Sequence, residues 1–265
     1  MTVDVSGVIT TIGNTKVLII AVIFVLLFIA ERVAAAASPP IGRERLVRNF
    51  GLMFVILLLS PLIITPITAF GANHLLWTRP DWMMTGALAV VVITIDIVLL
   101  DLWTYWVHRL YHRVPLFWRL HSVHHLDEFL DSTSAFRFHV GEVILSAFLR
   151  LIMIVILAPS LATVIFYETL LVSTALFHHS NLRMPPKLER GLALLIVTPS
   201  IHWVHHHATV PDTNSNFAAV FSLWDRLFTS KSDTMRDRNM KIGLESIEDK
   251  PFFRLILMPF QRKER

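Results

Sequence analysis

The sequence predicts an all-α, integral-membrane helical bundle of about four spans, plus or including a short hairpin, with a cytoplasmic histidine-rich cap. Three observations predict this fold. Of 265 residues, 54% are hydrophobic and only 17% are charged, whereas roughly 25% of the residues in soluble domains are charged. Long apolar runs recur along the chain, joined by short basic segments. Twelve of the thirteen histidines lie between His108 and His207, a concentration that chance does not explain.

Composition also excludes several classes of protein. The chain has no cysteine, which rules out disulfides, thiolate nucleophiles, iron–sulfur clusters and cysteine-based zinc sites. Any metal must therefore bind through His, Asp, Glu or Asn. A net charge of +4 could suggest nucleic acid, but the basic residues border apolar runs and form no dense cluster. Membrane orientation explains them better, so no nucleic-acid partner is expected.

The first two apolar runs predict two membrane crossings. Residues 17–37 are almost uninterrupted Val, Ile, Leu, Phe and Ala, close to the roughly 20 residues needed to cross a bilayer core. The second run, 50–70, contains Pro61 and Pro66. Neighbouring helices can satisfy the backbone groups that proline frees inside a membrane, so we expect a kinked helix there.

Two later segments complete the predicted bundle. A third run, from about residue 84 to 107, ends directly in the first histidine group. Residues 143–177 are apolar again, and Ala158-Pro159-Ser160 near their middle predicts two short spans that form a hairpin. We therefore expect three regions: N-terminal transmembrane helices (1–100), a catalytic region (101–230) and a polar cytoplasmic C-terminal tail (231–265).

Basic residues in the short loops predict the orientation in the membrane. The loop between the first two spans carries three arginines, Arg43, Arg45 and Arg48, whereas the loop 71–83 carries Arg79 alone. Cytoplasmic loops are enriched in Lys and Arg, so the first loop should be cytoplasmic. Counting crossings then places 108–142 on the cytoplasmic side, and the hairpin returns the chain to that side at His178. All the histidine groups are thus expected at one membrane face.

Three short segments space their histidines by three or four residues. In a helix, such residues share one face, so each segment can present two or three imidazoles together. Neutral imidazole binds zinc, copper, iron and nickel. The segments contribute eight candidate ligands: His108, His112, His121, His124, His125, His202, His205 and His206. Eight ligands exceed the needs of one tetrahedral zinc, so the count favours two metal ions.

The remaining histidines are assigned separately. His178 and His179 are adjacent and cannot both face one point on a helix, and we favour His178 as the ligand. For His139, the roles of metal ligand and polar neighbour both stay open. His207 extends a group that is complete without it, and His74 is isolated in the loop predicted on the opposite side.

Carboxylates inside apolar segments are the other candidate functional residues, because charged groups in membranes are usually functional. Asp101 lies seven residues before His108, two helical turns away. It could accept the second N–H of a ligating histidine, or form a hydrogen bond that pairs two helices. Glu142 and Glu168 are weaker candidates for supporting the ligands. Asp96 is expected to pair within the bundle.

The order of the motifs resembles the fatty acid hydroxylase/sterol desaturase superfamily. The resemblance covers about 101–229 and rests on HxxxH (residues 108–112), two HxxHH motifs (121–125 and 202–206), Phe177-His-His-Ser-Asn181, Asn216 and Leu223-Trp-Asp-Arg-Leu-Phe228. The eight histidines above and His178 fall on ligand positions of that family. His139 lies in a stretch similar to the family's FHPxE, with Val140-Gly141 in place of Pro-Leu. Thr174 replaces a histidine found in some hydroxylases.

The resemblance implies a non-haem diiron oxidoreductase with O₂ as co-substrate. It implies hydroxylation or desaturation of a membrane lipid, such as a sterol, a fatty acyl chain or an ether lipid. Because no haem, flavin or nicotinamide motif is present, we expect a separate electron donor of the cytochrome b5 or ferredoxin type. Zinc could occupy the site after isolation. The alternatives are a zinc-dependent membrane hydrolase and a non-redox metal-binding membrane protein, although Arg109 replaces the glutamate that an HExxH protease requires.

Overall fold

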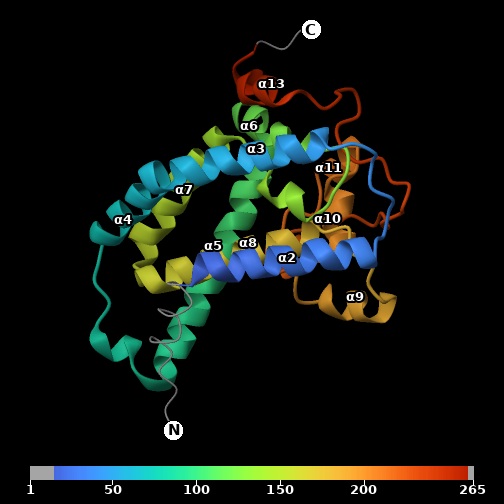
Figure 1. Ribbon diagram of the computed structural model, residues 1–265. Coiled ribbons are helices and arrows are strands. Elements are labelled where there is room, and N and C mark those ends of the chain that lie inside the picture. Colours follow the sequence, from blue (N-terminus) through green and yellow to red (C-terminus); the bar gives the residue numbers. More distant parts are fainter. Residues whose placement is uncertain (1–14, 262–265) are drawn as a thin grey trace.

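The computed structural model describes residues 15–261. In this part of the chain, helices are joined by loops, which form isolated β-bridges but no strands (Figure 1). The long helices are α2 (Lys16–Val33), α3 (Glu44–Leu59), α5 (Gly86–Arg113), α7 (Val140–Leu157) and α8 (Leu161–His179), and α4 (Thr65–Asn73) extends α3. The shorter ones are α6 (Pro115–His125), α9 (Pro186–Leu192), α10 (Pro199–His205), α11 (Val210–Thr213), α12 (Leu223–Leu227) and α13 (Phe252–Leu257). The all-α prediction is confirmed. The first 14 residues of the predicted region 1–100 and the last four of 231–265 lie outside the described residues.

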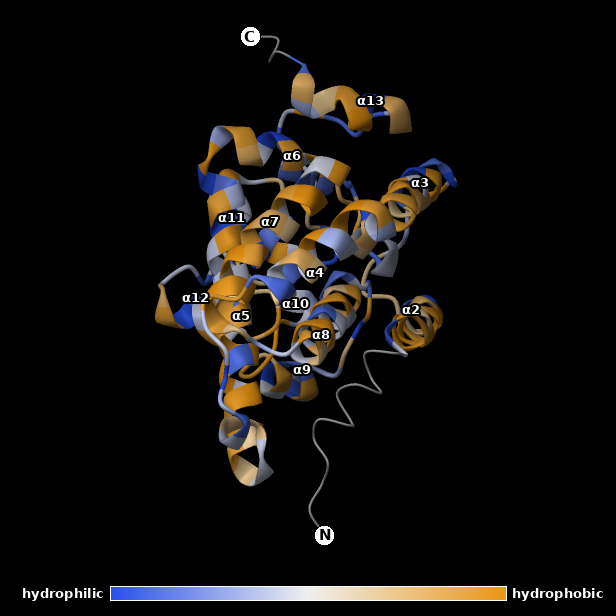
Figure 2. Cartoon of the chain, turned by 90° about the vertical axis from the view of Figure 1, so that its left-hand side faces the viewer, coloured by the Kyte–Doolittle hydropathy of each residue, from blue (hydrophilic) through white to orange (hydrophobic). Residues whose placement is uncertain are grey.

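Within residues 15–261, four helical segments are long and apolar enough to cross a membrane: 44–73, α5, α7 and α8. Figure 2 shows these segments as mostly hydrophobic along their length. The predicted number of spans agrees, but the predicted first crossing, 17–37, is not among the four. Its helix α2 ends at Val33 and carries three charged residues, Lys16, Glu31 and Arg32. Glu31 is buried, where it accepts hydrogen bonds from Ser132 and Asn181 near the histidine-rich end.

The segment with two prolines has the irregularity that the sequence predicts. Between α3 and α4 the backbone forms a π-helical turn, Ser60–Ile64. Pro61 lies in this turn and has no backbone N–H, so a regular α-helical hydrogen bond cannot form at that residue. The helix nevertheless continues into α4 without a loop (Figure 1).

The hairpin of α7 and α8 is also present, although its two helices are longer than the short spans expected. They contain 18 and 19 residues and are joined at Ala158, whose positive φ of 50° ends α7. The Ser160 side chain then accepts a hydrogen bond from the Thr163 N–H and begins α8. The two helices have different partners, because α7 packs mainly on α4 and α5, whereas α8 packs mainly on α2 and the 3-10 turn Ser132–Phe136.

A buried ion network fixes α3 to the loop after α6. The Arg45 guanidinium contacts Asp127 at 2.6 Å and Asp131 at 2.8 Å, and Asn49 donates to Asp127. Burial raises the pKa of Asp127, but Arg45 and Arg137 more than offset this and hold it below its usual value. Arg45 and Arg48, two of the three arginines that predict the orientation, therefore lie in the first turns of a helix that is anchored beside the histidine segments.

The C-terminal region 231–265, which the sequence predicts as a polar tail, contains the short helix α13. Leu255 of α13 is buried against Leu52 and Val123, so this helix packs on α3 and α6. Phe253 and Phe260 are 78% and 73% exposed. The region therefore ends in an amphipathic segment. Its apolar residues are scattered among polar ones in the sequence, and six helical residues are too few for a clear periodic pattern.

Candidate metal centre

Two groups of histidines converge at one end of the bundle. Within each group the potential ligand nitrogens lie within 4.8 Å of one another. The first group contains five residues: His108, His112, His121, His125 and His205. The second contains four buried residues: His124, His179, His202 and His206. The expectation that separate segments meet at one end is confirmed.

Helical periodicity explains how few elements supply so many ligands. The last turns of α5 provide His108 and His112 to the first group. Helix α6 contributes to both groups, because its consecutive residues project about 100° apart. His125 therefore faces the first group and its neighbour His124 the second. The α10 segment divides its histidines between the groups in the same way.

Most of the imidazoles are oriented by a hydrogen bond from Nδ1, which leaves Nε2 directed at the other rings. Donation from Nδ1 selects the tautomer whose Nε2 lone pair is free to bind a metal. The bonds join His108 to the Phe217 carbonyl (2.7 Å), His121 to Glu142 (2.7 Å), His124 to the Arg137 carbonyl (3.1 Å), His179 to the Ala175 carbonyl (2.7 Å) and His205 to the Ser215 carbonyl (2.6 Å).

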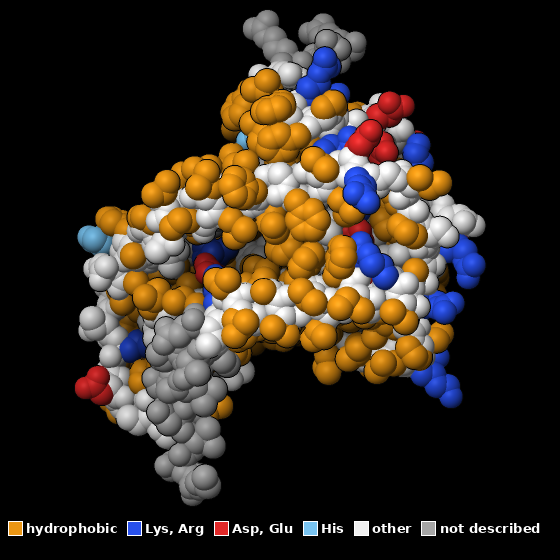
Figure 3. All heavy atoms as spheres, viewed as in Figure 1, with side chains coloured by type: hydrophobic (Ala, Val, Ile, Leu, Met, Phe, Trp, Pro, Cys, Tyr) orange, Lys and Arg blue, Asp and Glu red, His pale blue; other side chains and the backbone are white. Residues whose placement is uncertain are grey.

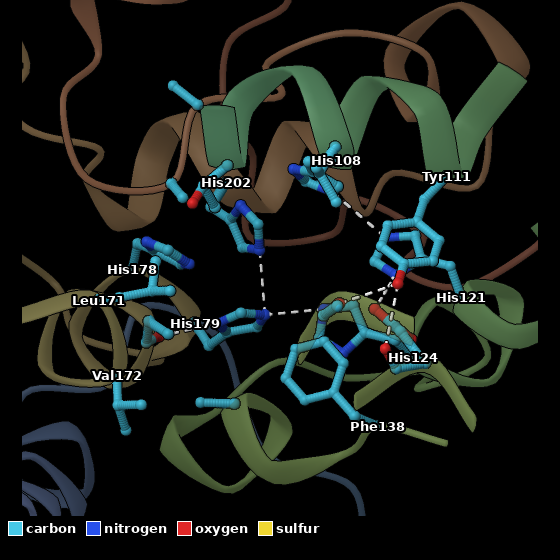
Figure 4. A pocket seen from close by; sticks show the side chains of 18 of the residues that line it. His108, Tyr111, His121, His124, Phe138, Leu171, Val172, His178, His179 and His202 are labelled. Atoms are coloured by element: carbon cyan, nitrogen blue, oxygen red, sulfur yellow. Dashed lines mark hydrogen bonds and ion pairs between the residues drawn. The ribbon is translucent and has the colours of Figure 1, made fainter. Parts of the chain in front are cut away.

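The inward nitrogens face one another without enough hydrogen-bond partners. The Nε2 atom of His179 lies 3.0 Å from those of His124 and His202 (Figure 4). Both ring nitrogens of His112, His125 and His206, and Nε2 of His205, are buried with no hydrogen-bond partner. Unpaired buried polar atoms are costly, and a cation shared by their lone pairs would remove that cost. The donor set therefore fits metal ions.

Electrostatics keep these imidazoles in their metal-binding form. Burial, followed by the neighbouring imidazoles, holds the pKa values of five histidines in α6 and α10 well below 6.5: His124, His125, His202, His205 and His206. Each is therefore neutral at pH 7, with a lone pair available to a metal.

The α8 histidine that lies within a group is not the one favoured from the sequence. The structure places His179 in the second group, whereas the sequence analysis favoured His178. The His178 ring lies beside that of His202, tilted by 42° with 4.0 Å between ring centroids, and its Nδ1 has no hydrogen-bond partner. Since α8 ends at His179, the rotation of its last turn decides which ring faces the group, and residue spacing does not reveal that rotation.

The other uncertain histidines lie outside both groups. His139 begins α7, where its Nδ1 accepts a hydrogen bond from the Gly141 N–H and its Nε2 donates to the Ile256 carbonyl. Both its nitrogens are therefore already used, which leaves it as a polar neighbour and helix cap. His207 pairs with Asp212 at 2.7 Å. His74 caps the end of α4 and stacks on Phe70.

Of the two roles left open for Asp101, the structure shows the hydrogen bonds that pair helices. Asp101 accepts hydrogen bonds from the Trp224 indole, the Phe221 N–H and the Tyr167 hydroxyl, and its described partners include no histidine. Two helical turns separate it from His108 by about 10 Å, too far for direct contact. Glu168 pairs with Lys16 and Arg150.

Glu142, a weaker candidate from sequence, is the carboxylate that contacts a ligand. Its Oε1 accepts from His121, and its Oε2 is buried without a hydrogen-bond partner. It follows His121 by 21 residues and comes from another helix, so spacing alone could not rank it above Asp101.

A cavity of about 220 Å³ leads from the histidines between the membrane helices. Six histidines line it: His108, His121, His124, His178, His179 and His202 (Figure 4). Its walls are largely apolar and include Trp103, Val107, Phe138, Leu171 and Val172. Such a cavity can hold part of an apolar molecule against the metal-binding end while excluding water.

The sequence pattern of the fatty acid hydroxylase family matches residues 93–230, which include every histidine of both groups and most of the cavity. The chain belongs to this family. The match agrees with the resemblance in the motifs.

Several characterised proteins are similar to this family member. Ornithine lipid hydroxylase OlsE from Rhizobium tropici is 26% identical over 65% of this chain and 51% of its own length. Alkylglycerol monooxygenase from Danio rerio is 30% identical over 48% of this chain and 28% of its own. Protein CER1-like 1 from Arabidopsis thaliana is 25% identical over 66% of this chain and 28% of its own length. The matches thus span about half of the first relative and just over a quarter of the other two. No solved structure matches the chain.

Proposed function

We propose that this member of the fatty acid hydroxylase family oxidises a membrane lipid with O₂ at a diiron centre held by the nine histidines of the two groups. The observation that carries the proposal is the pair of converging, incompletely hydrogen-bonded imidazole groups at the end of a cavity between membrane helices. Iron bound there would supply the electrons that activate O₂ for cleavage of an unactivated C–H bond. The relatives named as lipid hydroxylase and alkylglycerol monooxygenase support a lipid substrate.

The protein's own residues bind and orient the substrate. Trp103, Leu171 and Val172 provide apolar contact for a chain that enters between the helices. Contact with these side chains holds the reacting carbon in place, and the exclusion of water protects the oxidant from side reactions. Glu142 fixes the His121 ring, so the position of one ligand does not depend on metal binding alone. Sterols, fatty acyl chains and ether lipids remain candidate substrates, and hydroxylation and desaturation remain candidate outcomes.

The histidine groups are proposed to face the cytoplasm, as Arg43, Arg45 and Arg48 indicate. Electrons then come from a separate cytoplasmic donor of the cytochrome b5 or ferredoxin type. A groove beside α10 supports the proposal of such a donor. It is lined by six basic residues, Arg183, Arg190, Arg226, Lys231, Arg236 and Arg238, and by four acidic ones, Glu189, Asp225, Asp233 and Asp237. The excess of positive charge can steer an acidic redox protein toward the metal-binding end.

Metal analysis combined with lipid turnover tests the proposed function. Purified protein should contain two iron ions per chain, and with a reducing system it should consume O₂ while a membrane lipid gains a hydroxyl group or a double bond. Lipidomic comparison of cells with and without the gene would identify the substrate class. Full occupancy by zinc with lipid hydrolysis, or two bound ions with no O₂ consumption under any reductant, would favour the hydrolase or the non-redox alternative instead.

A further inference from the structure

A polar stripe runs along one face of α7 from the histidines into the membrane region. Glu142, Ser146 and Arg150 are four residues apart, so they lie one above another on the helix, and all three line the cavity. The residues around them in α7 are almost entirely apolar. Ionisable groups inside membrane segments are costly and usually functional. Glu142 already contacts His121, but the metal centre gives no role to Arg150.

Arg150 belongs to a cluster with a net positive charge. Its Nη1 donates to Glu168 Oε1 at 2.5 Å, while the Lys16 ammonium donates to Oε2 of the same carboxylate at 2.6 Å. Two cations therefore share one anion. The three side chains are only 29% exposed or less. Figure 3 shows a hollow in the surface near the start of α2, with acidic and basic side chains at its bottom.

The unbalanced charge points to an anionic group in the cavity. Both oxygens of Glu168 are engaged, so one positive charge of the cluster remains without a counter-ion among these three residues. At low dielectric such a charge attracts an oxyanion strongly, and a guanidinium can hold carboxylate or phosphate through two N–H groups. Arg150 lines the cavity, whereas Lys16 and Glu168 do not.

We propose that Arg150 binds an oxyanion of the lipid, a carboxylate or a phosphate, while the apolar part of the same molecule extends toward the histidines. Eight residues of helix separate Arg150 from Glu142, a rise of about 12 Å. Trp103, Val107 and Leu171 line the cavity with them. Oxidation of the lipid at the histidine end rests on the proposed function, but binding of the oxyanion does not.

A purely structural role for Arg150 would be to tie helices together, and the chain contains a matched example. Arg79 donates to both oxygens of Asp96 and to the Leu157 carbonyl, which joins α5 to the end of α7. Arg79 does not line the cavity. Replacing Arg79 therefore breaks a comparable ion pair between membrane helices without changing the proposed binding site.

Equilibrium binding without a reductant tests the proposal separately from turnover. The probes are radiolabelled palmitate, hexadecyl phosphate and methyl palmitate, which resemble one another in chain length and differ in the anion. Metal-loaded full-length protein in detergent is compared with R150Q, R150K, K16Q and R79Q. Wild-type protein should bind one or both anions more tightly than the ester. R150Q should weaken that binding by about tenfold or more, since a hydrogen-bonded charge is lost, with little change for the ester.

The other variants make the result specific. R150K should restore part of the anion affinity, K16Q should weaken it by less than R150Q, and R79Q should leave it unchanged. Loss of palmitate binding alone would identify a carboxylate as the bound group, and loss of hexadecyl phosphate binding alone a phosphate. Equal wild-type affinity for anions and ester would overturn the proposal even if R150Q failed to fold. So would an unchanged anion affinity in folded R150Q, or an equal loss in R79Q.

Discussion

The two histidine groups share helices but differ in their surroundings. The first group has a carboxylate beside it, since Glu142 accepts from His121, and it receives two ligands from α5. Rings of the second group are oriented through carbonyl oxygens alone, those of Arg137 and Ala175. A metal in the first group would therefore have a carboxylate hydrogen-bonded to one of its ligands, whereas the described hydrogen bonds of the second-group rings reach no carboxylate. Both groups depend on α6 and α10, so local sequence changes can separate them.

The largest expected effect is the loss of one metal ion from either group through adjacent substitutions. His125→Ala should empty the first group and His124→Ala the second, because each removes a ligand that water cannot replace with the same geometry. Each variant should retain about one iron and lose lipid oxidation. Metal analysis with spectroscopy of the remaining ion would show whether the two variants keep different sites.

His74→Ala is the control, because this histidine caps α4, stacks on Phe70 and belongs to neither histidine group. It should retain the metal content and activity of the wild type. If His74→Ala were as damaging as His124→Ala at normal expression, the active centre would not lie at the histidine groups.

A second comparison uses neighbours at the end of α8. His179→Ala should reduce the metal content of the second group, whereas His178→Ala should keep both ions, because its ring lies outside the described groups. His178 lines the cavity, so its replacement should alter substrate binding more than metal content. Metal content and KM measured on both variants would check this. The reverse pattern of metal loss would restore the original sequence assignment.

Local spacing explains why most of the site could be predicted from sequence. The pattern of histidines three and four residues apart depends only on helix geometry, and it identified eight of the nine grouped residues. The choice between His178 and His179 depends on how α8 rotates against α10. The partition of His124 and His125 between two groups likewise requires the position of the other helices. Neither is encoded in local periodicity.

Long-range packing also limited the fold prediction. The apolar runs identified four segments that could span a membrane, but α2 is apolar too, and its buried Glu31 is explained only by bonds to Ser132 and Asn181. The cavity stripe was missed for a related reason. Arg150 appeared in the sequence as one charge in an apolar run, and its partners Glu168 and Lys16 come from two other helices.

Glu142→Gln tests the electrostatic difference between the groups. The amide can still occupy the same space and accept from His121, but it removes the negative charge. The first group should lose metal affinity by about 10 to 100-fold, as is typical when a residue that supports a ligand is changed. The second group should be nearly unaffected. Titration with a competing chelator would measure the two affinities, and equal weakening at both would contradict the assignment of Glu142 to one group.

Asp101→Asn should have the smallest effect on the metal centre and should act on stability instead. Asp101 is fully buried and accepts from Trp224, Phe221 and Tyr167. An amide replaces one acceptor oxygen with a donor that faces another donor, which costs about 1 to 3 kcal/mol for an unsatisfied buried group. We therefore expect a lower thermal unfolding temperature with metal content near that of the wild type. Loss of metal at unchanged stability would instead support the first sequence hypothesis, in which Asp101 supports a ligating histidine. The result would thus decide whether this carboxylate belongs to the histidine groups or to the packing of α5 against α8 and α12.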